Sequence, residues 1–184
     1  MRLRLFKSSF LGAALLLLLS TNLSTCHAFQ SQMSPNDPKD GTKKTPKGFV
    51  RLFDGSTLKG WHLDGGHGPG YVPKDNVLIV PADGGGNLYT DKVYSDFVFR
   101  FEFRVDKAGN NGIGLRAPGH GDAAYVGMEC QVLDDYDSSY ANLLPGQYHG
   151  SIYRVLPAKR GATNHAGEWN EEEITAIGRH IKVK

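Results

Sequence analysis

The chain has 184 residues, of which 40% are hydrophobic and 22% charged, and this length and composition indicate one folded domain. Its 23 glycines and 9 prolines favour many turns and argue against a coiled coil or a helical repeat. The formal net charge is +2, but three basic residues lie in the first seven positions, and without them the charge is −1. No general basic field is then left to bind nucleic acid or an anionic membrane.

The N-terminal segment has the pattern of a secretory leader. Basic residues precede an apolar run over residues 10–19, which is too short to span a bilayer, so no transmembrane span is expected. Small residues three and one positions before Phe29 indicate cleavage after Ala28, and hence a signal peptide over 1–28 and export to the periplasm or the extracellular space. The alternative is a lipoprotein box that ends at Cys26, whose lipid would anchor the protein.

Cysteine content excludes a small protein held together by disulfides. Cys130 has no intramolecular partner whether or not Cys26 remains in the mature chain. The stability of the domain must therefore come from buried apolar side chains.

Residues 29–47 are polar and lack apolar periodicity, which indicates a flexible linker before a folded domain over 48–184. The clearest strand spans 97–105, where phenylalanines alternate with polar and charged residues. A glycine- and asparagine-rich turn at 106–112 and a resumed alternation at 113–116 predict a hairpin. Further strands are expected over 77–80, 127–133, 150–156, 171–177 and 180–184.

The 171–177 segment could also form a short helix by propensity, but Trp169 before it and Gly178 after it favour a strand. No ten-residue amphipathic helix separates the strands, which argues against a parallel α/β fold. Many short strands with polar outer faces predict an antiparallel β-sandwich or jelly roll.

Polar residues in the 127–133 strand are the first candidates for chemistry. Glu129 and Gln131 share one face of the strand, and Asp134 lies at its end. The spacing is similar to the E-x-D-x-x-E strand of jelly-roll glucanases, which need two carboxylates about 5 Å apart, but Gln131 cannot ionise. The alternative is a solvated strand face that ends in an acidic turn.

Two further candidates are a guanidinium and an imidazole. Arg116 follows an alternating strand on its outward side, where it could bind sugar oxygens or pair with Glu102 or Asp135. His149 stands between two aromatic residues in a glycine-bounded segment, where it is either a surface or capping residue or a base for proton abstraction.

Glu168, Trp169 and Asn170 place an acid, a stacking ring and an amide together, although Trp169 could be an ordinary core residue. The histidines have no zinc-site spacing, and the 134–137 segment lacks the glycine and terminal glutamate of an EF-hand. The sequence therefore identifies no metal site, and a divalent cation stays an open alternative.

Five segments occur in the order typical of one family. They are Gly48–Trp61, Asn110–Arg116, Gly127–Asp135, Gly150–Tyr153 and Gly167–Asn170. Together they resemble the 3-keto-disaccharide hydrolase domain family. The resemblance implies a concanavalin A-like, glucanase-type jelly roll, exported by bacteria, that acts on 3-keto-glycosides. It also implies a set of cleft residues, namely Arg116, Glu129, Gln131, Asp134, Tyr153 and Trp169.

The ketone of a 3-keto-glycoside favours elimination, because it acidifies the proton on C2 and the resulting enolate can expel the substituent on C1. This route needs a base, an enolate stabiliser and an acid for the departing oxygen. The hypothesis assigns His149 or Glu129 as the base, Arg116 or a bound cation as the stabiliser, and Asp134 or Glu168 as the acid.

The resemblance also implies further strands after 180–184, so we expect a sandwich that is incomplete at its C-terminal end. An open sheet edge would then allow self-association. The competing function is a non-catalytic carbohydrate-binding module, because the same fold serves lectins. Such a module would need stacking aromatics around its cleft, such as Trp61, Tyr148 and Trp169.

Overall fold

The computed structural model describes the backbone of residues 2–18 and all atoms of residues 45–184. Cys26, the expected cleavage point after Ala28 and most of the expected linker lie outside the described residues. The strands are β1 (Arg2–Leu18), β2 (Phe49–Arg51), β3 (Trp61–His67), β4 (Val72–Lys74), β5 (Val77–Ile79), β6 (Gly85–Thr90), β7 (Tyr94–Arg104), β8 (Asn110–Ala117), β9 (Met128–Leu133), β10 (Asn170–Ile177) and β11 (His180–Val183). The helices are α1 (Ala123–Val126) and two 3-10 turns, η1 (Ser138–Tyr140) and η2 (Pro145–Gln147).

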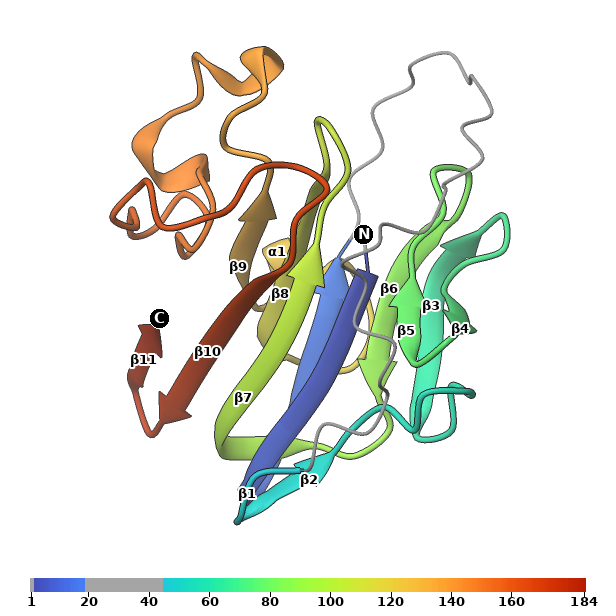
Figure 1. Cartoon of the computed structure of the whole chain (residues 1–184). Helices are drawn as coiled ribbons and strands as arrows, with labels where there is room; N and C mark the ends of the chain where they lie inside the picture. Colours follow the sequence, from blue (N-terminus) through green and yellow to red (C-terminus); the bar gives the residue numbers. More distant parts are fainter. Residues whose placement is uncertain (1, 19–44) are drawn as a thin grey trace.

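The strands form an antiparallel β-sandwich, which confirms the predicted fold class (Figure 1). The front sheet has the order β11-β10-β7-β1-β5-β4, and the back sheet the order β3-β6-β1-β8-β9. β1 belongs to both, since its first part pairs with β7 and its last residues pair with β8 and β6. The segment that reads as a secretory leader is thus a central strand of this structure.

The core lies between the sheets, and period-two alternation brings its residues there. The phenylalanines of β7 are at most 2% exposed, and they face apolar residues of β8 and β9. The facing residues are Ile113, Leu115, Cys130 and Val132. Each buried side chain of this size stabilises the fold by about 1.5–3 kcal/mol. The predicted faces of β7 and β9 are therefore confirmed.

The predicted hairpin over 97–116 is wrong. β7 pairs with β1 and β10, whereas β8 pairs with β1 and β9, so the turn between them carries the chain from one sheet to the other. The reason is that the apolar faces of β7 and β8 must meet across the core, which two strands of one hairpin cannot do.

The predicted strand over 150–156 is also wrong in most of its length. Only two isolated bridges form, from Ile152 to Cys130 and to Leu156, because the chain turns back at Arg154, whose φ is 59°. The 171–177 strand is confirmed as β10, and it pairs with β7 and β11.

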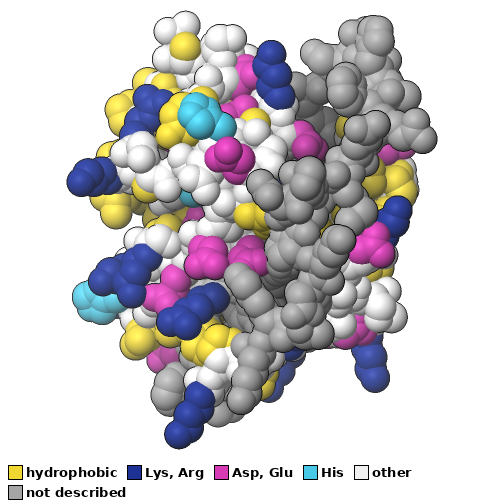
Figure 2. All heavy atoms as spheres, in the orientation of Figure 1, with side chains coloured by type: hydrophobic (Ala, Val, Ile, Leu, Met, Phe, Trp, Pro, Cys, Tyr) yellow, Lys and Arg dark blue, Asp and Glu magenta, His cyan; other side chains and the backbone are white. Residues whose placement is uncertain are grey.

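Charged side chains of both signs gather on the outer side of the front sheet over β10 and β11 (Figure 2). Glu173 of β10 accepts from Arg100 Nε at 2.7 Å and from Lys184 Nζ at 2.8 Å, and these contacts lower the pKa of its carboxyl. This face is a solvated, ion-paired surface. In the described part of the chain, no helix has the length and apolar character needed to cross a membrane.

Candidate functional site

Polar residues gather on the outer face of the back sheet, where β8, β9 and the segment 150–153 lie side by side. Because Cys130 and Val132 point into the core, Glu129 and Gln131 project to the opposite side of β9. Across the strand pair, Gly114 lies opposite Glu129 and Gly112 lies opposite Gln131. Two glycines therefore leave this part of β8 without side chains.

The 150–153 segment extends the same face at the edge of β9. Tyr153 N–H donates to Glu129 O at 2.8 Å, and Gly150 N–H donates to Gln131 O at 2.8 Å. Since Cys130 and Ile152 form an antiparallel bridge, their neighbours Glu129 and Tyr153 stand opposite each other on one face. We call this surface, made by Gly112, Gly114, Glu129, Gln131 and Tyr153, the Glu129 face.

The side chain of Glu129 lies flat over β8. A Cβ atom added at Gly112 would stand 2.0 Å from Glu129 Oε1, so only glycine allows this position. Burial and, to a smaller extent, the negative charge of Asp122 raise the pKa of Glu129 to about 7. Near neutral pH the carboxyl can therefore both accept and donate a proton.

Two glutamines orient the hydroxyl of Tyr153. Gln147 Oε1 accepts from Leu144 N–H at 3.0 Å, which turns Gln147 Nε2 toward Tyr153, where it donates to the hydroxyl oxygen at 2.9 Å. Gln131 Nε2 in turn donates to Gln147 O at 3.3 Å. Because the phenol oxygen accepts from Gln147, its own proton is free to be donated to a ligand.

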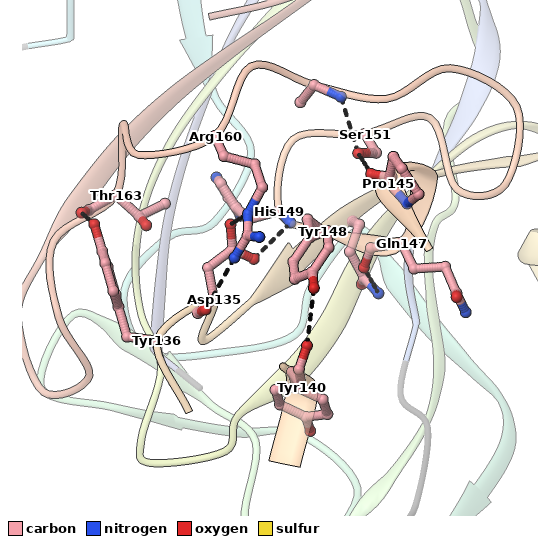
Figure 3. A network of polar contacts seen from close by, with 12 residues as sticks. Asp135, Tyr136, Tyr140, Pro145, Gln147, Tyr148, His149, Ser151, Arg160 and Thr163 are labelled. Atoms are coloured by element: carbon pink, nitrogen blue, oxygen red, sulfur yellow. Dashed lines mark hydrogen bonds and ion pairs between the residues drawn. The ribbon is translucent and has the colours of Figure 1, made fainter. Parts of the chain in front are cut away.

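His149 lies on the other side of β9 from the Glu129 face. Its Nε2 stands 3.2 Å from Glu172 Oε2 of β10, and its ring centroid is 5.0 Å from that of Phe103. Asp135 accepts from the His149 N–H at 2.9 Å, and its carboxylate lies 3.8 Å from Arg160 Nε (Figure 3). His149 and Glu129 are therefore held apart by the backbone of β9, and they cannot contact one substrate together.

The guanidinium of Arg116 contacts residues of the front sheet. It donates to Ser95 O and, at 2.8 Å, to Gly178 O, and it lies 4.0 Å from Asp96. These contacts tie β8 to the start of β7 and to the β10–β11 turn. Arg116 is therefore distant from His149, which contacts Glu172. Gly178 lies six positions from Glu172 along an extended chain, and this spacing corresponds to about 20 Å.

Asp134 stabilises a turn. It is 5% exposed, and its carboxylate accepts from Ala108 N–H at 3.0 Å and from Tyr136 N–H at 3.3 Å. Glu129, Gln131 and Asp134, which the spacing groups together, thus make three separate sets of contacts.

Glu168 and Trp169 lie on the loop before β10. Glu168 is exposed, and its backbone oxygen accepts from Asn170 Nδ2 at 3.3 Å. Trp169 is half-buried, with the Arg104 guanidinium carbon 5.4 Å from its ring centroid.

The aromatics that a binding module would need are mostly in the interior. Trp61 is 8% exposed and donates from Nε1 to Leu52 O at 2.9 Å, and Tyr148 is 5% exposed. Neither ring is presented to a ligand. Among residues 45–184, no group of three or more His, Cys, Asp and Glu side chains is arranged to hold a metal ion.

Two functional features were missed by reasoning from the sequence. The G-x-G spacing of Gly112 and Gly114 on a strand indicates a surface free of side chains. The alternation of Glu172 with the buried Ile174 and Ala176 indicates that this glutamate points into the sandwich.

The comparisons with known proteins agree with the family resemblance read from the sequence. Residues 48–184 match the family model of the 3-keto-alpha-glucoside-1,2-lyase-like domain. A 3-keto-disaccharide hydrolase of Bacteroides thetaiotaomicron is 28% identical over 153 residues, which cover 69% of this chain and 52% of that protein. The chain therefore spans about half the length of this relative.

A crystal structure from Parabacteroides distasonis has a similar fold. It is that of a provisionally assigned glycosyl hydrolase, with a TM-score of 0.58, 21% identity, and coverage of 73% of this chain and 67% of that one. This likeness supports the sandwich fold.

Proposed function

Because the chain belongs to the 3-keto-alpha-glucoside-1,2-lyase-like domain family, we propose that it cleaves 3-keto-glycosides at the Glu129 face. The name of the Bacteroides relative supports a 3-keto-disaccharide as substrate. The observation that carries the proposal is the position of Glu129, a carboxyl with a pKa of about 7 that lies over a glycine on an outer sheet face. Tyr153, from a separate landmark segment, stands beside it.

The proposed reaction begins with proton transfer from C2 of the 3-keto sugar to the Glu129 carboxylate. The electrons of the C2–H bond form a C2–C3 double bond, and the π electrons of the C3 carbonyl move onto its oxygen. The product is an enolate with its charge on the oxygen at C3. A hydrogen bond from the Tyr153 hydroxyl stabilises this oxygen, as an oxyanion-hole donor does.

The bond from C1 to the departing oxygen then breaks, and a C1–C2 double bond forms in conjugation with the ketone. Glu129 returns its proton to the departing oxygen, so the residue is regenerated and elimination consumes no water. Addition of water across the double bond completes a net hydrolysis. This scheme gives Glu129 both the base and the acid role, and it uses neither Arg116 nor Asp134, whose side chains bind backbone groups.

The test uses 3-keto-trehalose in D₂O, with product release and deuterium at C2 measured separately. Glu129→Gln should lower both rates by about 10²-fold or more, the lower range for a lost general base. Tyr153→Phe should slow both by about 10²-fold, as expected for one oxyanion donor. Glu173→Gln, on the outer face of the other sheet, is the matched control and should keep the parent rate. A Glu129→Gln variant with normal rates would refute the proposal.

We further propose that the chain is exported and associates with itself through open strand edges. The leader pattern of residues 1–28 supports export. Cleavage after Ala28 would remove β1 from both sheets and leave the edges of β7 and β8 available to a second copy. N-terminal sequencing of the secreted protein and sedimentation of the mature chain test these two points.

A further inference from the structure

A second polar site lies beside β10 and β11, in a cavity of about 540 Å³. Its walls come from β10, β11 and the 156–163 loop, and Phe103, His149 and Glu172 also line it. The volume is within the range of small-molecule sites, roughly 300–1,000 Å³. Because the cavity is on the inner side of β9, it is separate from the Glu129 face.

Three buried polar atoms that form no hydrogen bond belong to residues that line this cavity, and one of them, Glu172 Oε2, has a single ion-pair contact, with His149 Nε2 at 3.2 Å. They are His149 Nδ1, Thr163 Oγ1 and Glu172 Oε2, and the only other such atom among residues 45–184 is Asn111 Nδ2. Glu172 is 5% exposed, and its other oxygen, Oε1, accepts from the Cys130 thiol at 3.3 Å. A buried polar group without a partner costs about 1–3 kcal/mol, so their concentration in one cavity points to a ligand that pairs with them.

The chemistry of these atoms selects a hydroxylated ligand. When His149 Nε2 donates its proton to Glu172 Oε2, His149 Nδ1 is an acceptor and the second lone pair of Glu172 Oε2 can still accept, while the Thr163 hydroxyl can donate or accept. Hydroxyl groups of a ligand can donate to the first two and exchange a hydrogen bond with the third. The apolar side chains of Phe103, Ile181 and Val183 offer a surface for the C–H face of a ring.

Charge argues for a neutral ligand. Two of the cations in the cavity wall are already paired, since Arg160 lies 3.8 Å from Asp135 and Lys184 lies 2.8 Å from Glu173. The third cation of the wall, Lys159, has an exposed side chain, and a phosphate or carboxylate that entered deeply would approach the buried carboxylate of Glu172. We propose that the cavity binds a neutral pyranose, the ring of an ordinary glucoside without a keto group.

The test is calorimetric titration of methyl α-D-glucopyranoside into the full-length Glu129→Gln variant. This variant removes turnover at the Glu129 face and leaves the cavity unchanged. Saturable binding with a dissociation constant on the order of 1 mM is expected, with the same value for the unmodified chain. Because binding is measured without turnover, the result does not depend on the proposed lyase reaction.

Three variants assign the binding to the cavity. Glu172→Gln should weaken binding at least tenfold, because an uncharged group replaces a charged acceptor of the same size. Thr163→Val, which keeps the shape of the loop residue, should weaken it several-fold. Glu173→Gln alters the next residue on the opposite face of β10 and should bind like the parent.

The proposal is overturned by absence of saturable binding, or by equal affinity in the Glu172→Gln and Thr163→Val variants. Tighter binding of glucose 6-phosphate or of glucosamine than of the neutral glucoside would also overturn it. A thermal unfolding scan of each variant confirms that it is folded, and Thr163→Val alone decides the question if Glu172→Gln does not fold.

Discussion

The buried carboxyl of Glu129 should make the protein less stable as pH rises from about 4.5 to about 7. Its pKa is raised from 4.5 to about 7 in the folded protein, so between these values the unfolded chain loses a proton that the folded one keeps. Stability falls with pH wherever the folded state binds more protons. A shift of this size corresponds to about 3 kcal/mol, at 1.36 kcal/mol for each pKa unit.

Glu129→Gln removes this dependence. Below pH 4 the carboxyl is neutral in both states and the variant should match the parent in stability, because glutamine has nearly the same shape. At pH 8 the variant should be more stable by about 3 kcal/mol, while its activity is lost. The same substitution would then stabilise the fold and abolish the activity.

Urea unfolding of both proteins at pH 4, 6 and 8 measures the effect, with Glu173→Gln as the control. The pKa of Glu173 is lowered by Lys184 and Arg100, so its replacement should not make the protein more stable at pH 8. A constant stability difference between parent and Glu129→Gln at all three pH values would refute the burial argument. So would a variant that is less stable than the parent at pH 8.

Three further predictions concern the fold and the site. Gly112→Ala should cost about 1–3 kcal/mol in urea unfolding and lower turnover by about 10²-fold, because the new Cβ displaces the Glu129 carboxyl; unchanged turnover would contradict it. Arg116→Ala should cost about 1–3 kcal/mol but leave turnover per folded molecule unchanged, since the side chain holds backbone carbonyls; a change in turnover alone would contradict it. Deleting residues 1–28 should lower the midpoint of thermal unfolding and make it rise with protein concentration, because β7 and β8 lose their β1 partner and pair with a second copy instead; an unchanged midpoint that does not depend on concentration would contradict it.

Alternation along single strands made much of the fold readable from the sequence. The phenylalanines of β7 and the residues Cys130 and Val132 of β9 point inward as predicted, because successive side chains of a strand face opposite sides. The same rule places Glu129 and Gln131 together. A local pattern is sufficient to predict which side chains share a face, because successive side chains of a strand alternate whichever strands it pairs with.

The neighbours of each strand were decided only by tertiary structure. Alternation does not say that β7 and β8 belong to different sheets, nor that Arg116 reaches the carbonyl of Gly178. It also does not separate His149 from Glu129, because that separation depends on the return of residues 150–153 along the edge of β9. These features depend on contacts between residues distant in the sequence, whose geometry follows from the packing of the whole core. The sequence thus determined which side chains of single strands point inward, and the packing of the sheets separated polar residues that the sequence had grouped together.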